Sequence, residues 1–413
     1  MREIMYLTGY EYQKIFRKHS TWIALILVFV WAVISGFGGI IGGYYVDGEK
    51  TASHYQRIRT QREALEHLEI RELNEEFFRK EKEISKSLLQ PQEELLYSEQ
   101  AKGNRAEYWM RYYENYAPYD NFYMLLNMME MQVGKIDQEK MTAEDFYRIR
   151  KIMMEYTGKD QKLSEGEQAF HMKQNEQIKT PYAYGNMLGY DSYFQILASD
   201  FILLAFAAAV ILAPMFAGEY TSHMDGLVLS SRYGKNKLIY AKLLTGISFA
   251  FFSSVILSGI LLLEIQAIYG LGDWNLPIQV SLTGCYLSLP VNLLEFLGII
   301  TGCCVISTCM TSMFVLFCSV NMKSPFGVII VSFAFIFVPV VLIYAVNGHR
   351  LLFMIINSMP SSMVFPGSVA AHQLISVGNH YFYFFQWVPA VYLCLMGLLS
   401  WWIFRSFRNH QVR

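Results

Sequence analysis

One apolar span stands before a long polar stretch, and five more apolar spans follow it. The first span runs from Thr21 to Tyr45, and the polar insert runs from Val46 to Gln195. A helix needs about 20 apolar residues to cross a bilayer, where its backbone polar groups must be paired internally. The layout therefore predicts an all-α membrane protein with six transmembrane helices. The five later spans are predicted at Ile196–Ala217, Leu243–Ile268, Leu287–Val320, Phe326–Val346 and Tyr381–Phe404.

Basic residues in the short connecting segments predict the orientation of these spans. Loops rich in Lys and Arg tend to stay in the cytoplasm, whereas long translocated segments are largely exempt from this bias. The opposite side has only Arg350 in its two short loops. We therefore expect a cell-membrane protein with both termini cytoplasmic and residues 46–195 extracellular. The residues on the cytoplasmic side are Arg2, Lys14, Arg17, Lys18, Arg232, Lys235, Lys237, Lys242, Lys323, Arg405, Arg408 and Arg413.

Residues 1–20 mix apolar and charged side chains, which favours an amphipathic helix lying on the inner membrane surface. The extracellular insert is predicted to be mostly helical. A broken apolar stripe predicts a helix over His54–Gln90 that Pro91 ends. Thr142 and Ser164, each followed three residues later by an acidic residue, predict helix starts, and Gly158 predicts a helix end.

Two aromatic clusters, at residues 108–123 and 182–194, have three interpretations. They form an interfacial belt, the core of the insert, or a surface that contacts a substrate. The six cysteines all lie in or beside the predicted spans, where cysteine acts mainly as a small apolar packing residue. The insert therefore has to fold without disulfide bonds.

Sequence motifs for common catalytic and cofactor sites are absent from the chain. It contains no G-x-x-x-x-G-K-[ST] phosphate loop, no H-E-x-x-H or Cys/His zinc spacing, and no G-x-S-x-G elbow. We expect no catalytic residue, no metal or cofactor site and no nucleic-acid partner. Glu295, inside the predicted fourth span, is a candidate translocation-path residue or a hydrogen-bonded group in the bundle interior. Asp191, Asp200 and Glu264 are expected at the outer membrane interface.

Residues 218–242, between spans two and three, carry the most specific pattern in the chain. A Glu closes span two, a Gly and a Leu-rich turn follow, then an Arg, and a Lys opens span three. This pattern closely resembles the first cytoplasmic loop of ABC-2 type permeases, the membrane subunits of one class of ABC transporter. Ser230 and Ser231 stand where that family often has a proline. The matching residues are Glu219, Gly226, Leu227, Leu229, Arg232 and Lys242, with Asp225 as a second acid in a mainly cationic loop.

The resemblance extends to residues 1–45 and 196–413, including Lys323 after span four and the proline-containing segment 350–380, which is similar to a re-entrant hairpin. It implies a permease subunit of an ATP-driven exporter, with ATP and Mg²⁺ held by a separate ATP-binding subunit. A second permease subunit, identical or related, is implied, as is contact with membrane lipid. The implied cargo is amphipathic or hydrophobic, such as a peptide antibiotic or a lipid-like compound.

The loop has a physical rationale as a coupling element between the ATPase and the membrane. A helix over Thr221–Ser231 would protrude to the partner, and Glu219 would pair with Arg232 or Lys242 to keep the loop rigid. The alternative is a basic loop that only fixes topology. For the whole chain, the alternative function is a non-transporting membrane sensor or immunity protein that binds a ligand through its insert. An intramembrane enzyme, with Glu295 as its acid, is a third possibility.

Overall fold

The computed structural model describes residues 2–138, 140–270, 272–343, 345–346, 349–378 and 380–409. Some residues in the predicted ranges lie outside the described part of the chain, among them Met1 of the N-terminal helix, Glu139 of the insert, Tyr344 of the fifth span, Asn379 of the 350–380 segment and Arg413 of the tail.

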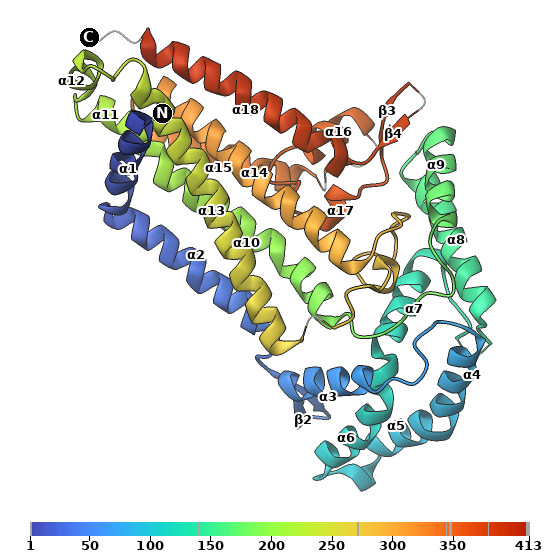
Figure 1. Ribbon diagram of the computed structural model, residues 1–413. Coiled ribbons are helices and arrows are strands. Elements are labelled where there is room, and N and C mark those ends of the chain that lie inside the picture. Colours follow the sequence, from blue (N-terminus) through green and yellow to red (C-terminus); the bar gives the residue numbers. More distant parts are fainter. Residues whose placement is uncertain are drawn as a thin grey trace.

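Among the residues that the structure describes, six helices are long and apolar enough to cross a membrane, which matches the predicted number of spans and is consistent with a multi-pass membrane protein. They form an elongated bundle (Figure 1). Helix α1, Arg2–Phe16, and the C-terminal end of α18 lie at one end, here called the loop end; the insert lies at the other, the insert end. The six spans are α2 (His19–Gly38), α10 with its 3₁₀ extension (Leu188–Met215), α13 (Lys237–Ile268), α14 (Leu293–Asn321), α15 (Pro325–Leu342) and α18 (Phe384–Arg408).

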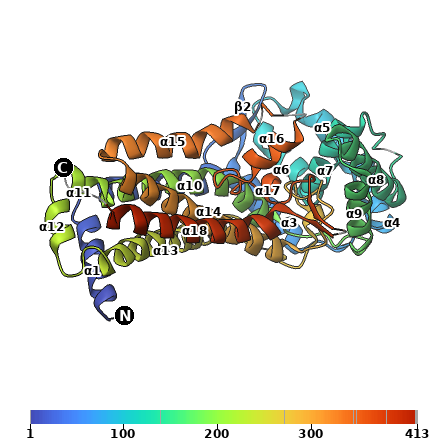
Figure 2. The same cartoon turned by 90° about the horizontal axis from the view of Figure 1, so that it is seen from above.

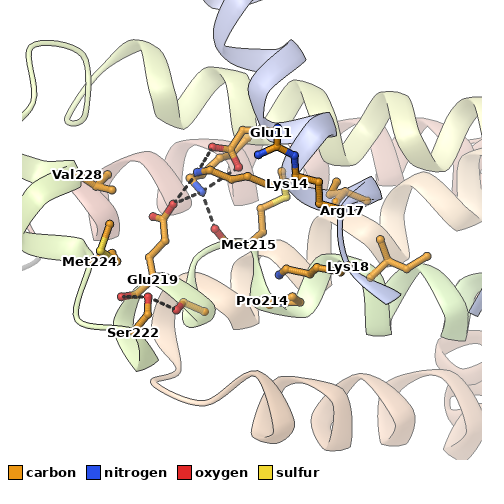
Figure 3. A pocket seen from close by; sticks show the side chains of 14 residues that line it. Glu11, Lys14, Arg17, Lys18, Pro214, Met215, Glu219, Ser222, Met224 and Val228 are labelled. Carbon is orange, nitrogen blue, oxygen red and sulfur yellow. Dashed lines mark hydrogen bonds and ion pairs between the residues drawn. The ribbon is translucent and has the colours of Figure 1, made fainter. Parts of the chain in front are cut away.

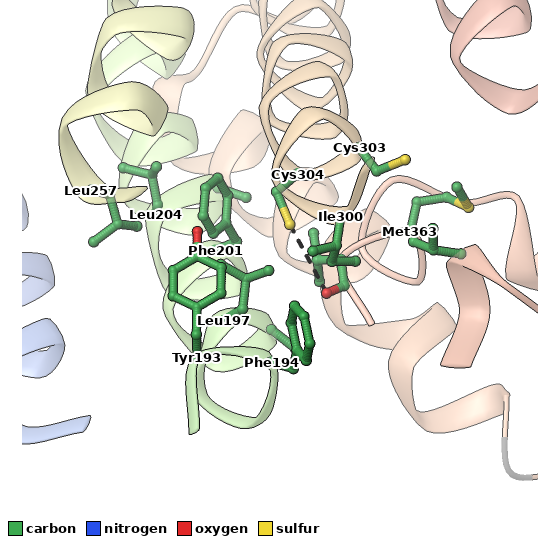
Figure 4. Packing of buried hydrophobic residues seen from close by; sticks show 14 of the residues in the cluster. Tyr193, Phe194, Leu197, Phe201, Leu204, Leu257, Ile300, Cys303, Cys304 and Met363 are labelled. Carbon is green, nitrogen blue, oxygen red and sulfur yellow. Dashed lines mark hydrogen bonds between the residues drawn. The ribbon is translucent and has the colours of Figure 1, made fainter. Parts of the chain in front are cut away.

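Helices α10 and α14 form the centre of the bundle. In the most apolar 18-residue stretch of each helix, 67% and 78% of the residues are buried. The corresponding values for α15 and α18 are 22% and 17%, so these helices present their apolar surfaces outward, as lipid-facing helices do. Near the insert end, Phe194 and Phe201 of α10 face Ile300 of α14 in a continuous apolar core (Figure 4). Close packing around this central pair fixes where the ends of the other spans lie.

Glycine allows one close approach between two spans. A Cβ at Gly189, in the first turn of α10, would lie 2.2 Å from the backbone oxygen of Gly270, just after α13. Backbone cannot yield as a flexible side chain can. We expect Gly189→Ala to lower the thermal unfolding midpoint, whereas Gly259→Ala, where no atom lies within 4 Å, leaves it unchanged or raises it. Equal midpoints in the two purified variants would show that this contact does not constrain the bundle.

The first span ends earlier than predicted. Residues 43–46 belong to strand β1, Gly43–Val46, which pairs antiparallel with β2, Glu49–Ser53. Gly42 adopts a φ of 113°, which only glycine adopts without strain, and this turns the chain out of the helix. At the other end of the insert, α10 begins at Leu188, because the aromatic residues before Ile196 continue the helix.

The insert is mostly helical, as predicted. Both predicted helix starts are present, at Thr142 and at Ser164, and each has a capping box. Its helices are α3 (His54–Glu66), α4 (Glu75–Ile84), α5 (Gln90–Leu96), α6 (Arg105–Tyr116), α7 (Asp120–Val133), α8 (Ala143–Asp160) and α9 (Glu165–Glu176).

Two predicted helix ends in the insert were wrong. The helix expected over His54–Gln90 is interrupted after α3. Pro91 does not end it, because the backbone stays helical from α4 into α5, which continues past Pro91 to Leu96. A π-helical segment, Ser85–Leu89, carries the chain from α4 into α5. Gly158 does not end α8, which continues to Asp160.

The aromatic clusters form the core of the insert and of its junction with α10. Phe77 and Phe122 make edge-to-face contacts with centroids 5.2 Å apart, and Tyr184 packs against Phe77. Tyr182 and Tyr193 are 1% and 0% exposed. Side chains buried to this extent cannot line a substrate-contacting surface, so the core interpretation is the one that the structure supports.

Residues 350–380 leave the bundle and return to it at the insert end, between α15 and α18 (Figure 1). They fold as two short helices, α16 (Arg350–Asn357) and α17 (Pro366–Val369), followed by a hairpin of β3 (Ile375–Val377) and β4 (His380–Phe382). This path is compatible with the predicted re-entrant segment.

Helices α8 and α9 dock the insert onto the membrane helices through buried polar contacts. Arg150 of α8 donates to the carbonyl oxygens of Cys285 and Leu287, which precede α14. The Glu167 carboxylate of α9 is fully buried and accepts two hydrogen bonds from Arg350, at 2.7 and 2.6 Å. The insert is therefore held against two parts of the bundle that are far apart in the sequence, the segment before α14 and the start of α16.

A pair of buried histidines lies at this junction. His171 Nδ1 is 2.6 Å from the Ser288 hydroxyl, and its Nε2 is 2.7 Å from the carbonyl oxygen of His372. Burial lowers the pKa of His171, and burial together with His171 and Arg150 lowers the pKa of His372 to about 3. Both rings are therefore neutral in the docked state at neutral pH.

Acid should loosen this junction. A histidine with a lowered pKa stabilises the docked state above the unfolded pKa of about 6.5, and that contribution falls as the pH drops below it. We expect the thermal midpoint to fall between about pH 7.5 and pH 5.5, and to fall less in His171→Gln, which retains hydrogen-bonding groups without titrating there. Identical pH slopes for the wild type and the variant would contradict this.

Candidate functional site at the loop end

The loop between α10 and α13 contains two short helices instead of one. Helix α11 spans Ala217–Thr221 and α12 spans Asp225–Ser230, so the predicted continuous helix over Thr221–Ser231 was wrong. His223 adopts a φ of 54°, a left-handed conformation that breaks the helix between them. The loop therefore leaves the bundle through α11 and turns sharply before α12.

Lys242, in the second turn of α13, is fully buried. Its Nζ donates to the carbonyl oxygen of Met215 at 2.6 Å, to Glu219 Oε1 at 2.8 Å and to Glu11 Oε2 at 3.2 Å. A buried ammonium is retained only when it is paired and hydrogen-bonded. This single lysine joins the end of α10, the first helix of the loop and the N-terminal helix.

Lys14 completes a network of alternating charges, since its Nζ lies 2.7 Å from Glu11 and 3.3 Å from Glu219 (Figure 3). Burial opposes the charge on Lys14, but the two carboxylates outweigh it and raise its pKa. The pairing of Glu219 with Lys242 predicted from the sequence is thus present. The alternative partner, Arg232, instead stacks over the Tyr233 ring, 5.4 Å from its centroid.

The participation of α1 was not predicted. Glu3 accepts hydrogen bonds from Tyr233 and Lys237, and these bonds hold the pKa of Glu3 below its ordinary value. Tyr12 is hydrogen-bonded to Ser248 of α13 at 2.8 Å. Figure 2 shows α1 running across the ends of the long helices. Glu11 shares the buried face of α1 with Thr8 and Ile15, and an acid on that face was the signal that could have indicated a basic partner.

The loop also rests on the end of α14. The Ser319 hydroxyl accepts from the backbone N–H groups of Phe216 and Ala217, and Tyr220 donates to the carbonyl oxygen of Val320. Thr221 donates to the carbonyl oxygen of Lys323 at 3.0 Å. Displacement of α11 would therefore act directly on both α13 and α14.

Helix α12 has a buried face and an exposed apolar face. Asp225 and Leu229 are each 8% exposed, whereas Leu227 is 66% exposed and Met224, just before the helix, is 47% exposed. Gly226 follows Asp225 in the first turn. Apolar side chains exposed beyond the ends of the spans indicate a surface that another protein or a membrane covers.

Glu295 lies at the exposed start of the fourth span, and not in its interior. Helix α14 begins at Leu293, and Glu295 is exposed in its first turn, where it forms a capping box with Asn292. Its carboxylate accepts from the Asn292 N–H at 2.9 Å. The segment before Leu293 is apolar but irregular, which made the predicted span too long.

Two other acids of the spans, Asp191 and Asp200, are buried, whereas Glu264 of α13 is partly exposed. Asp200 is fully buried and accepts a hydrogen bond from Ser35 of α2 at 3.1 Å. Asp191 is 5% exposed and accepts from the N–H groups of Leu282 and Thr283. These carboxylates stabilise contacts between segments.

Comparisons with protein-family models, curated proteins and solved structures find no match to this chain.

Proposed function

We propose that this chain is the membrane subunit of an ATP-driven exporter of the ABC-2 type. The observation that carries the proposal is the buried Lys242, which links α11 of the loop to α1 and α13 through Glu219 and Glu11. A permease without its own ATPase must receive mechanical work from a separate subunit. The permease therefore needs an element that protrudes toward the ATPase, and stiff contacts from that element to its membrane spans.

The loop meets both requirements. Leu227 and Met224 offer an apolar surface for the ATP-binding subunit, and Glu219 and Thr221 transmit its movement to α13 and α14. In this proposal the loop end is cytoplasmic, the insert is extracellular, and ATP and Mg²⁺ bind the partner. A second permease subunit pairs with this one in the membrane.

A cavity at the insert end supports an amphipathic or hydrophobic cargo. It has a volume of about 520 Å³ and lies between the start of α10, α16 and α17. Phe194, Phe353 and Phe365 supply apolar walls, and Asn357 and Ser368 supply polar groups. Sites for drug-sized molecules have volumes of about 300–1,000 Å³ and this mixed lining. We therefore place the exit of the transport path beside the insert.

Replacing Leu227 with aspartate tests the docking surface. A charge on the exposed apolar face of α12 should abolish co-purification of a P-loop ATPase while the protein remains folded, because the side chain supports no internal packing. Val377→Asp, at a residue that is 64% exposed in the hairpin of the insert end, is the matched control and should co-purify the ATPase normally. Normal ATPase recovery with Leu227→Asp would overturn the assignment of this surface.

The second candidate is a membrane sensor or immunity protein. The buried contacts between Glu167 and Arg350 favour it, since they connect the insert rigidly to the membrane helices and could convey ligand binding. The two functions differ in their partners. A stoichiometric ATPase supports the exporter, and a ligand-binding insert without an ATPase supports the sensor.

A further inference from the structure

A pocket of about 490 Å³ opens at the loop end, between the turn that joins α1 to α2 and the start of the loop. Figure 3 shows Arg17 and Lys18 on one side of it and Met224 and Val228 on the other. Ile15, Ile211 and Pro214 are among the apolar residues of its wall. The pocket therefore has a cationic rim and an apolar wall.

The charge of this pocket is not balanced by its own acids. Glu11 and Glu219 line it, and both are already paired with Lys14 and Lys242. Within the part of the chain that the structure describes, Arg17 and Lys18 form no ion pair with a carboxylate. Burial is the main cause of the lowered pKa of Lys18, and repulsion from the nearby Lys242 adds to it. Two cations are thus available for an anionic ligand.

The pocket lies where the apolar spans begin. Lys18 directly precedes α2, and Pro214 directly follows the last residues of α10. Trp22, in the first turn of α2, is 51% exposed and donates its indole N–H to the carbonyl oxygen of Phe16. Tryptophan in this position is typical of the level where headgroups meet hydrocarbon. A ligand at this depth can present a charge to the rim and an apolar part to the wall.

We propose that this pocket binds the phosphate-bearing headgroup of an anionic phospholipid. Arg17 and Lys18 contact the phosphate, and an acyl chain lies against Ile211 and Pro214. Basic pockets beside membrane helices are a recurrent form of site for anionic headgroups. A zwitterionic lipid fits less well, because its own cation would meet the positive rim. A soluble phosphate would leave the apolar wall unused.

Such a lipid would contact the coupling network as well as the membrane. Lys14 is 54% exposed and lies farther from Glu219 than from Glu11, at 3.3 Å against 2.7 Å. A headgroup phosphate can compete with Glu219 for this lysine. Lipid composition would thereby adjust how firmly α1 holds the loop.

The test is native mass spectrometry of the purified full chain, offered equal amounts of phosphatidylglycerol and phosphatidylcholine. Wild-type protein should retain mainly phosphatidylglycerol, and Arg17→Gln/Lys18→Gln should weaken its binding by about thirty-fold. Arg405→Gln/Arg408→Gln, which removes two cations at the same end of the bundle, should have no such effect. Lys18→Arg keeps the charge and should retain the preference.

Undiminished phosphatidylglycerol binding in the double variant would overturn the proposal. Displacement of the lipid by an equal concentration of glycerol 3-phosphate would also overturn it, because the site would then serve a soluble anion. The experiment needs neither an ATPase nor transport. It therefore fails or succeeds independently of the proposed export function.

Discussion

Lys242→Met is expected to destabilise the protein more than any other single substitution in the loop. It removes the closer cation of Glu219 and leaves Glu11 with Lys14 alone, and breaking a buried ion pair on one side costs about 3–5 kcal/mol. The thermal unfolding midpoint in detergent should fall by about 5 °C or more. Lys235→Met, which removes an exposed lysine from the same loop, should have little effect.

The compensated variant separates charge imbalance from loss of packing. Lys242→Met combined with Glu219→Gln and Glu11→Gln removes the buried lysine and both carboxylates, and leaves only Lys14, whose side chain is 54% exposed and can remain solvated. It should recover much of the lost stability, because neutral groups of similar size often replace buried ion pairs without penalty. A triple variant no more stable than Lys242→Met alone would show that the charges are not what holds these helices together.

Glu167→Gln is expected to have the second largest effect, on the junction between insert and membrane helices. The fully buried Glu167 carboxylate accepts hydrogen bonds from Arg350 and from the N–H of Leu374. Burial alone would raise the pKa of Glu167, but these hydrogen bonds outweigh it and lower the pKa. The glutamine amide has one acceptor oxygen, so it cannot accept both of the hydrogen bonds that the Arg350 guanidinium donates to the carboxylate. Because the Arg350 side chain is 44% exposed and its charge can be solvated, we expect a cost of about 1.5–3 kcal/mol, the range for a lost hydrogen bond to a charged group.

Hydrogen–deuterium exchange measures this loosening directly. Exchange in α9 and in the backbone around Leu374 should rise at least about tenfold in Glu167→Gln, since partial loss of docking exposes those amides. Glu165→Gln changes an exposed residue in the same turn of α9 and should exchange like the wild type. Unchanged protection of α9 in Glu167→Gln would mean that the insert is held by other contacts.

Apolar length alone was enough to predict the six spans, because crossing helices carry this signal in consecutive residues. The pairing of Glu219 with Lys242 was predictable from residues that are close in sequence. Glu11 was not, since it is 231 residues away from Lys242 and only packing of α1 on α13 brings them together. The contribution of α1 to the candidate site therefore depends on tertiary contacts that the local sequence does not indicate.

Local capping and backbone geometry account for most of the remaining differences. Glu295 lies in an apolar stretch, yet Asn292 captures it as a capping residue and so sets the start of α14. His223 has no sequence signal strong enough to predict a left-handed residue that divides the loop. In both cases one residue decides where a helix begins or ends, and a hydropathy pattern cannot predict that position.

Cysteine crosslinking of Leu227 to a co-purifying ATPase is the most direct test that this loop receives work from an ATP-binding subunit. In a Cys394→Ser background, which removes the exposed native cysteine, Leu227→Cys should form one crosslinked species with that subunit, in a yield that changes when ATP is added. Val377→Cys, exposed at the insert end, should form none. A Leu227→Cys protein that exports its cargo without ever crosslinking to an ATPase would contradict the proposed coupling role.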